Sequence, residues 1–376
     1  MTARLKVVTV VGTRPEIIRL APTMRLLDDL VDHVVVHTGQ NYDYELNELL
    51  FEDLALRPPD RFLHADTSTL GSALGTILAG IEVVLDEERP DALLVLGDTN
   101  SCIAAVMGRR MRVPVFHMEA GNRAFDENVP EETNRRLVDH VADYNLAYTE
   151  HARRNLLAEG LHPSRILVTG SPMREVLAAS RSRVDASDVL ERQGVAEGGY
   201  VLVSMHREET VDDPARLRRA LLALDAVADE LDAPVLVSTH PRTRARLAEQ
   251  EPELQRRLTL HPPFGFHDYV RLQRSARIVL SDSGTIAEES SILGFPAVTL
   301  RDAIERPEAL DVGGIVCCGV EPDAVLDAVR ATLAMHARLG AAAPPADYAA
   351  TDVSRRVASF ILSSARTHRA RAGLRR

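Results

Sequence analysis

In the first half of the chain, short apolar runs alternate with longer stretches in which apolar residues recur every three or four positions. The short runs are typical of buried strands, and the longer stretches have the periodicity of helices with one apolar face. Strands are predicted at residues 6–11, 33–37, 92–96, 114–117, 144–148 and 166–168, and helices at 16–29, 70–88 and 132–141. Strands that alternate with helices predict a parallel sheet covered by helices on both faces.

The alternation weakens at residues 174–197, which are polar and rich in alanine. It resumes with strands predicted at residues 200–204, 234–239, 258–261, 278–280 and 297–300, so a second sheet of the same kind is expected. The predicted domains are residues 1–173 and 198–352, joined by a linker region at 174–197 and followed by a C-terminal helix and basic tail at 353–376. We expect the tail to be frayed and solvated from residue 367.

The composition argues against several classes of protein. The 376 residues carry a formal net charge of −11, which argues against general nucleic-acid binding. The 3 cysteines are too few and too poorly spaced for a disulfide framework or a zinc site, and we interpret Cys317 and Cys318 as core packing. The chain runs directly into a strand, and its apolar runs fall short of the roughly 18 residues that span a bilayer, so a cytoplasmic protein is expected.

In doubly wound sheets, ligands bind at the carboxyl ends of the strands, and polar residues follow several predicted strands here. Gly12 ends the first strand, Arg14 opens the next helix, and Arg19 lies further along it. A cation beside a helix N-terminus favours an anion, although a tight turn with a surface arginine is the alternative. Asp98 follows the strand at 92–96, where it is either a catalytic acid or the cap of the next helix.

The segment 115–145 is the most informative stretch of the sequence. Glu119 ends an apolar strand, and Gly121 lets the chain turn. Pro130 suits the first turn of a helix, and Glu131 follows it. Carboxylates at a strand end and at a helix start can converge on one cleft, which is how acid and base groups reach a substrate.

Two histidines, His206 and His240, end neighbouring strands of the second half, and Arg207 lies beside the first. This favours a phosphate site over a metal site, because no supporting cluster of close ligands accompanies them.

Small residues and an arginine also favour phosphate binding in the second half of the chain. Ser283, Gly284 and Thr285 come directly before a predicted helix, whose free N–H groups suit a diphosphate. Arg306 follows a later strand and can supply a countercharge to the same diphosphate.

Taken together, these motifs resemble the non-hydrolysing UDP-N-acetylglucosamine 2-epimerases. The matching segments occur in the family's order over nearly the whole chain and are Gly12-Thr13-Arg14-Pro15-Glu16, Thr38-Gly39-Gln40, Gly97-Asp98-Thr99, His117-Met118-Glu119-Ala120-Gly121, Pro130-Glu131-Glu132, Asn134-Arg135, His206-Arg207-Glu208, Thr239-His240-Pro241, Asp282-Ser283-Gly284 and Glu305-Arg306-Pro307-Glu308. The resemblance implies an α/β fold of two Rossmann-like domains in the arrangement of the B-type glycosyltransferases (GT-B), with the active site in the cleft between them. It also implies a homodimer that needs no cofactor and binds a UDP-sugar.

The implied reaction interconverts UDP-N-acetylglucosamine and UDP-N-acetylmannosamine. A base removes the carbon 2 proton, UDP leaves to give a glycal, and UDP adds back with the proton on the opposite face. By resemblance, Asp98, Glu119 and Glu131 supply the carboxylates, and His206 acts near UDP. The residues implied in substrate or UDP binding are Arg14, Arg19, Gln40, Arg135, His240, Ser283, Gly284, Thr285, Glu289 and Arg306, and no metal ligand is expected. Which carboxylate is the acid and which the base is left open.

Some details look closer to a subgroup that epimerises 6-deoxy UDP-sugars during UDP-N-acetyl-L-fucosamine synthesis. They lie at His37–Tyr44, at Gly121-Asn122-Arg123 and at Gly265–Tyr269. Glu208 stands where many members carry a second arginine, which argues against a second, activating UDP-N-acetylglucosamine site. The alternatives are therefore a 6-deoxy UDP-N-acetyl-sugar as substrate, a GT-B glycosyltransferase, a hydrolysing epimerase, and a sugar-nucleotide sensor without activity.

Overall fold

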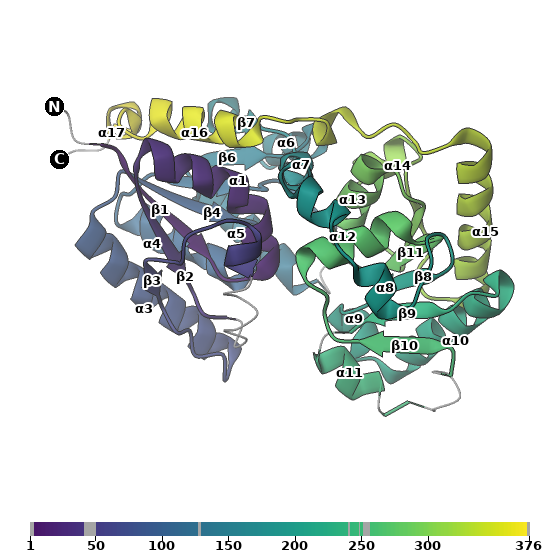
Figure 1. Cartoon of the computed structure of the whole chain (residues 1–376). Coiled ribbons are helices and arrows are strands. Elements are labelled where there is room, and N and C mark those ends of the chain that lie inside the picture. Colours follow the sequence, from purple (N-terminus) through teal and green to yellow (C-terminus); the bar gives the residue numbers. More distant parts are fainter. Residues whose placement is uncertain are drawn as a thin grey trace. The chain divides into compact units, whose positions relative to one another are not determined.

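The structure, a computed structural model, describes residues 4–40, 50–126, 129–239, 241–247, 249–250 and 256–373. The chain folds into two compact units. The first comprises Met1–Ala178 together with Asp347–Arg376, and the second comprises Ala179–Ala346. Each unit is an α/β structure built around one parallel sheet (Figure 1).

The first unit is organised around a sheet with the strand order β3-β2-β1-β4-β5-β6-β7. Its strands are β1 (Lys6–Val11), β2 (Asp32–His37), β3 (Arg61–Phe62), β4 (Ala92–Leu96), β5 (Val115–Met118), β6 (Tyr144–Ala147) and β7 (Ile166–Val168). All neighbouring strands are parallel, so their carboxyl ends meet at one edge of the sheet.

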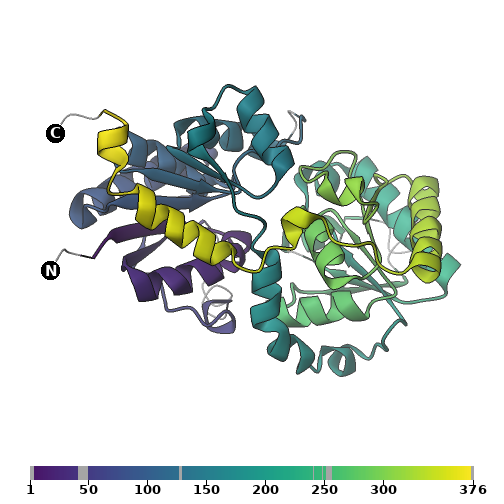
Figure 2. The same ribbon diagram turned by 90° about the horizontal axis from the view of Figure 1, so that it is seen from above.

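Helices pack on both faces of this first sheet. The helices of this unit are α1 (Arg14–Leu30), α3 (Leu70–Glu88), α4 (Ala104–Arg110), α5 (Pro130–Val141), α6 (Glu150–Ala158), α16 (Val353–Ser364) and α17 (His368–Arg371). Helix α7 (Met173–Asp185) begins in the first unit and ends in the second. Alternate strand residues such as Val8, Val10 and Leu93 form one buried cluster with α3, α4 and α5. Helix α16 lies along α1, as Figure 2 shows for the yellow and purple helices. Successive side chains of a strand point to opposite faces of the sheet, and helices cover both faces. This explains why the sequences of these strands are continuous apolar runs.

The second unit repeats this architecture with the strand order β10-β9-β8-β11-β12-β13. Its strands are β8 (Val201–Ser204), β9 (Val235–Ser238), β10 (Leu258–His261), β11 (Ile278–Ser281), β12 (Ala297–Thr299) and β13 (Val316–Cys317). Its helices are α8 (Val189–Gln193), α9 (Glu208–Val211), α10 (Pro214–Leu231), α11 (Pro241–Leu247), α12 (Phe266–Ser275), α13 (Ile286–Leu293), α14 (Glu308–Asp311) and α15 (Pro322–Leu339). The core on one face joins strand residues to α10 and α15. The predicted fold class, two Rossmann-like parallel α/β units of the kind that form GT-B proteins, is confirmed.

The C-terminal tail departs from the sequence prediction at one residue. Thr367 and residues 369–373 are exposed, as expected of a solvated tail, but His368, at the start of α17, is 5% exposed. The His368 ring packs edge-on against Tyr144, and its Nε2 lies 3.6 Å from a carboxylate oxygen of Asp143. The basic composition of the tail did not reveal this tertiary contact. Among the residues that the structure describes, no helix combines the length and the apolar character needed to cross a membrane.

Two glycines with the same backbone angle allow a matched test of the turn after β5. Gly121 and Gly160 both have φ of +87°, where a side chain costs about 1–2 kcal/mol. A Cβ on Gly160 meets nothing within 4 Å, whereas a Cβ on Gly121 overlaps the carbonyl oxygen of Ala152. We expect Gly121→Ala to lose about 1–3 kcal/mol more stability than Gly160→Ala, measured by urea unfolding followed by circular dichroism. Equal losses would contradict the close approach.

Candidate active site

Glu119 lies at the carboxyl end of β5 in an unusual backbone conformation. Its φ is +64°, a region that non-glycine residues seldom adopt and that is concentrated at functional sites. Its side chain is buried and forms an ion pair with Arg19 of α1, and it accepts a hydrogen bond of 3.2 Å from Asn122 Nδ2. The backbone N–H of Glu119 donates to the Leu146 carbonyl at 3.1 Å. The strained turn therefore holds one carboxylate in a fixed position at the sheet edge.

Asp98 lies at the end of the neighbouring strand β4. Arg135 donates to its Oδ2 from Nε at 3.0 Å and from Nη2 at 2.6 Å, and Asn134 donates to its backbone carbonyl at 3.0 Å. Glu131 precedes Arg135 by one turn of α5, so the two side chains share one face of that helix. Glu131 is half-buried and, among the described residues, has no hydrogen-bond or ion-pair partner. Helix α5 thus carries Glu131 beside the Asp98–Arg135 pair.

The first turn of α1 is tied to the loop after β4 by Glu16. The buried Glu16 carboxylate accepts from the backbone N–H of Gly12 at 2.6 Å and also from the hydroxyls of Thr99 and Ser101. Burial raises the pKa of Glu16, and these hydrogen bonds oppose the rise. Thr99 caps the short helix after β4, which leaves the Asp98 side chain to pair with Arg135. Glu16 therefore aligns the ends of β1 and β4.

Arg14 and Gln40 lie at the carboxyl ends of β1 and β2. Arg14 is the first residue of α1 and is half-buried. Gln40 donates from Nε2 to the Thr38 hydroxyl at 3.1 Å, and a Cβ on Gly12 would lie 2.5 Å from that Nε2. The glycine is needed for this close approach of the two strand ends.

Beneath the Glu119 turn lies a chain of four charged groups, which we call the Asp139 network: the buried His117, Asp139 and Arg123, and the partly exposed Glu159. The Asp139 carboxylate lies 3.0 Å from His117 Nδ1 and accepts from Arg123 Nη1 at 2.7 Å. Arg123 also makes a bidentate pair with Glu159, at 2.7 and 2.6 Å. The backbone N–H of Gly121 donates to the same Asp139 carboxylate. The Asp139 network therefore braces the turn that presents Glu119.

In the second unit, the buried carboxylate of Asp282 organises the loop after β8. Its Oδ2 accepts the backbone N–H groups of His206 and Arg207, each at 2.8 Å. Its Oδ1 lies 3.2 Å from His206 Nδ1, and the His206 side chain is 47% exposed. Asp282 therefore fixes the orientation of the imidazole, whose Nε2 edge is open to a ligand.

The loop from β11 to α13 brings the other expected residues of this unit together. The Ser283 and Thr285 hydroxyls lie 3.0 Å apart, and Arg306 donates to the Gly284 carbonyl. A Cβ on Gly284 would lie 2.9 Å from Arg306 Nη1, so a side chain there would press on the arginine. Glu289 of α13 is buried and accepts from Gln273 Nε2. A helix start with small residues and a buried arginine is a suitable seat for a diphosphate.

Comparisons with known proteins identify the family. A family model described as UDP-N-acetylglucosamine 2-epimerase matches residues 26–362. The chain belongs to this family. The structure of UDP-N-acetylglucosamine 2-epimerase from Rickettsia bellii is similar with a TM-score of 0.91 and 40% identity, covering 97% of this chain and 98% of that one.

Two further proteins are similar to this member of the epimerase family. The structure of Methanocaldococcus jannaschii UDP-GlcNAc 2-epimerase in complex with UDP-GlcNAc and UDP has a TM-score of 0.89 and 32% identity, covering 96% of this chain and 100% of that one. A Pseudomonas aeruginosa protein named UDP-2,3-diacetamido-2,3-dideoxy-D-glucuronate 2-epimerase is 33% identical over 334 residues, which are 88% of this chain and 92% of that protein.

Most of the site residues that were predicted for this member of the epimerase family lie in two groups, one in each unit. One, in the first unit, contains Arg14, Arg19, Gln40, Asp98, Glu119, Glu131 and Arg135, and the other, in the second unit, contains His206, Ser283, Gly284, Thr285, Glu289 and Arg306. His240 and the predicted motif positions Asn41–Tyr44 lie outside the described residues. Among the described residues, no group of 3 or more His, Cys, Asp and Glu side chains lies together as metal ligands do.

Sequence reasoning did not predict the supporting role of Asp139, Arg123, Glu159 and Asp282, although Arg123 and Asp282 lie within segments that the resemblance rests on. The available signal was a single polar residue inside an apolar pattern. His117 interrupts the apolar run of β5, and Asp139 lies next to Val138 on the buried face of α5. A buried charged residue needs a partner, so each such position predicts a second charge nearby.

The Asp139 network also predicts a pH dependence. Burial alone would lower the pKa of His117, but the Asp139 carboxylate and the Gly97 carbonyl outweigh burial and raise it. The stability that protonated His117 contributes is therefore complete below its unfolded pKa of about 6.5 and is lost as the pH rises through the higher folded value. We expect the urea-unfolding free energy to fall over this window in the wild type, and to fall less steeply in His117→Asn. Parallel pH profiles would show that His117 does not titrate there.

Proposed function

We propose that the chain is a non-hydrolysing UDP-N-acetylhexosamine 2-epimerase that interconverts UDP-N-acetylglucosamine and UDP-N-acetylmannosamine. The observation that supports this proposal is that Asp98 and Glu119 follow neighbouring strands at one sheet edge, while Glu131 lies in the first turn of the helix whose Arg135 pairs with Asp98, in a chain of this family. Inversion at carbon 2 needs a base on one face of the sugar and an acid on the other, and three carboxylates in one cluster can meet that need.

In this proposal the second unit holds the leaving UDP. The carbon 2 proton is weakly acidic, so stabilising the departing diphosphate has to carry much of the barrier. Arg306 and the N–H groups at the start of α13 are assigned to the diphosphate, together with Ser283 and Thr285. Glu289 is assigned to the ribose hydroxyls, and His206 acts beside the diphosphate in the orientation that Asp282 gives it.

The first unit supplies the proton chemistry and the remaining sugar contacts. Arg19 and Arg135 were expected to bind substrate directly, and their ion pairs with Glu119 and Asp98 give them a second role as holders of those carboxylates. Arg14 and Gln40, at the ends of β1 and β2, are assigned to the substrate, as is His240 from the sequence. A homodimer and a cytoplasmic location stay predictions from the sequence.

The decisive experiment is proton NMR of the purified chain with UDP-N-acetylglucosamine in heavy water. We expect a UDP-N-acetylmannosamine signal with deuterium at carbon 2 in both epimers, because a glycal that regains its proton from solvent exchanges it. Free N-acetylmannosamine with UDP would indicate a hydrolysing epimerase instead.

The same experiment separates the competing substrates. The relation to a 2-epimerase named for a different UDP-sugar supports a second arm with a 6-deoxy UDP-N-acetyl-sugar, the alternative predicted from the sequence. Exchange with only that sugar would replace the substrate and keep the reaction. No exchange with either sugar, from protein that is folded by circular dichroism, would reject the epimerase proposal and leave the transferase or sensor.

A further inference from the structure

Helix α12 of the second unit carries a buried amide side chain, Gln273, that contacts Glu289 of α13. Gln273 is 1% exposed, and its Nε2 donates a hydrogen bond to Oε2 of Glu289. Glu289 lies in the first turn of α13 and is 8% exposed. Its backbone N–H donates to the Thr285 carbonyl at 2.9 Å. The two helices therefore meet at a buried hydrogen bond, one turn from the proposed diphosphate seat.

The carboxylate of Glu289 sets the orientation of the Gln273 amide. The other end of the amide, Oε1, is buried and has no hydrogen-bond partner among the described residues. The opposite orientation would place Oε1 against the carboxylate, and both groups only accept hydrogen bonds. An unsatisfied buried acceptor destabilises a fold, and an apolar side chain of similar size avoids that cost. Glutamine at this position is therefore consistent with a use for its N–H donor.

Helix α12 is held in place near both of its ends. Near its start, Asp268 accepts hydrogen bonds from the Ser187 hydroxyl and from Arg192 Nη2, each at 2.6 Å. Near its end, the carbonyl of Leu272 accepts from the buried Tyr200 hydroxyl. A donor on a fixed helix holds its partner more precisely than a donor on a loop. The amide that α12 carries can therefore fix the direction of its carboxylate partner.

Gln273 differs from the groups that hold the carboxylates of the first unit, because it is neutral. Glu119 and Asp98 are paired with the cations Arg19 and Arg135. A neutral donor orients a carboxylate without neutralising its charge, and an ionised acceptor forms stronger hydrogen bonds than a neutral one. A carboxylate held in this way suits the two adjacent hydroxyls of a ribose.

We propose that Gln273 is a positioning residue that aims the Glu289 carboxylate at the 2′- and 3′-hydroxyls of a nucleoside diphosphate, so that the site selects ribonucleotides over deoxyribonucleotides. The inference rests on the proposed function, which assigns the ribose of UDP to Glu289. A carboxylate whose direction is fixed can accept from both hydroxyls without losing further side-chain freedom on binding. A 2′-deoxyribose offers only one of the two donors and leaves part of the buried carboxylate unpaired.

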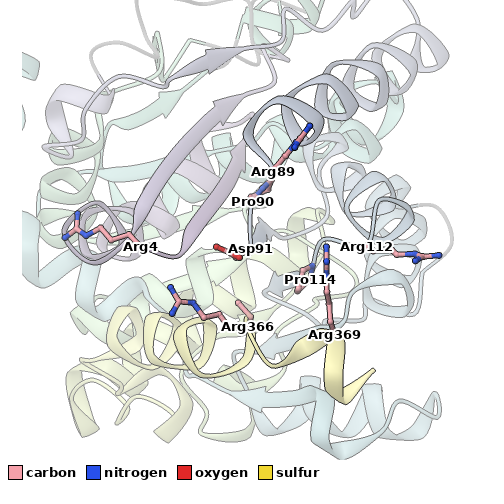
Figure 3. Close-up of a pocket in the computed structure, with 9 residues that line it drawn as sticks. Arg4, Arg89, Pro90, Asp91, Arg112, Pro114, Arg366 and Arg369 are labelled. Carbon is pink, nitrogen blue, oxygen red and sulfur yellow. The ribbon is translucent and has the colours of Figure 1, made fainter. Parts of the chain in front are cut away.

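A basic cavity of the first unit is a second place where a nucleotide could bind. Its volume is about 460 Å³, and its lining includes Arg4, Arg89 and Arg112. Figure 3 shows the guanidinium groups of these three arginines pointing away from the cavity, and Arg4 donates to the Asp29 carbonyl at 2.9 Å. Arginines contact phosphates, which UDP and 2′-deoxy-UDP share. A preference for the ribose therefore reports on Glu289 and not on this cavity.

The test is isothermal titration of the full chain with UDP and with 2′-deoxy-UDP. We expect the wild type to bind UDP about tenfold to a hundredfold more tightly, the effect of one hydrogen bond to a charged group. Gln273→Leu keeps the side-chain size and removes the donor, so it should weaken UDP more than 2′-deoxy-UDP and reduce the preference about threefold or more. The matched control Leu272→Val alters the buried neighbour on α12, and should lower the urea midpoint while keeping the preference.

A double variant shows whether Gln273 acts through Glu289. Glu289→Gln should remove most of the preference for ribose, and Gln273→Leu should weaken UDP binding no further in that background. A further loss in the double variant would overturn the positioning role, as would the wild-type preference in Gln273→Leu that is folded by circular dichroism.

The titrations also separate this inference from the proposed function. Carbon 2 exchange in the wild type, together with an unchanged preference in Gln273→Leu, would keep the epimerase and reject the role of Gln273 alone. Equal wild-type affinities for UDP and 2′-deoxy-UDP would likewise overturn the inference. A wild type that binds no UDP would reject the UDP seat of the proposed function and this inference with it.

Discussion

Replacing Glu131 by glutamine is expected to reduce epimerisation by about 10²–10⁴-fold while UDP binds as tightly as before. Glu131 opens α5 beside the Asp98–Arg135 pair and has no partner among the described residues. The replacement by glutamine therefore removes a proton-transfer group without unpairing a buried charge. Asp98 and Glu119 are poorer sites for this test, because each is paired with a buried arginine that would lose its counterion.

Two measurements test the Glu131 prediction. Turnover and carbon 2 deuterium incorporation are followed by NMR from each epimer separately, and UDP affinity is measured by isothermal titration. If Glu131 serves one face of the sugar, both directions of turnover fall, and the epimer from which solvent exchange is lost more strongly identifies its face. The matched control is Glu82→Gln, which changes an exposed side chain of α3 in the same unit. Turnover of the variant at the wild-type rate would remove Glu131 from the mechanism.

The sequence predicted the fold well because its strands are short apolar runs covered on both faces. The observed strands β1, β4, β7 and β10 and the helix α3 have the predicted bounds, and the other predicted strands differ by one residue at one or both ends. The strands β3 (Arg61–Phe62) and β13 (Val316–Cys317) were missed, because two residues are too few to show a periodicity. The buried His368 was missed because its partners, Tyr144 and Asp143, are distant in sequence.

For the candidate site, too, the sequence could predict one part and not the other. The placement of Asp98, Glu119 and His206 could be predicted because each lies within two residues of a strand end, and the ends of parallel strands converge at one sheet edge. The pairings could not be predicted. Arg19 and Glu119 are 100 positions apart, and Arg207 and Asp282 are 75 apart, so only the folded sheet brings them into contact.

Asp139→Asn is expected to destabilise the fold by about 3–5 kcal/mol, the cost of breaking a buried ion pair by removing one partner. The Asp139 carboxylate and the side chains of His117 and Arg123 are fully buried. Asparagine keeps the size but leaves His117 without a counterion and Arg123 with Glu159 alone, and its amide N–H groups would face the N–H of Gly121 and the Arg123 guanidinium. Because the chain has no tryptophan, the loss is measured by urea unfolding followed by circular dichroism.

Two further variants show whether the charge itself is responsible. Glu159→Gln removes the other partner of Arg123, but Glu159 is 27% exposed, so water can replace it and the loss should be clearly smaller. In His117→Asn/Asp139→Asn one unpaired cation is gone, so the double variant should lose less than the sum of the two single losses. Folded Asp139→Asn should also turn over more slowly, because the Gly121 N–H that it holds belongs to the turn presenting Glu119. A loss below about 1 kcal/mol would mean that the turn is held by its backbone alone, and the Asp139 network would then have no part in positioning the carboxylate.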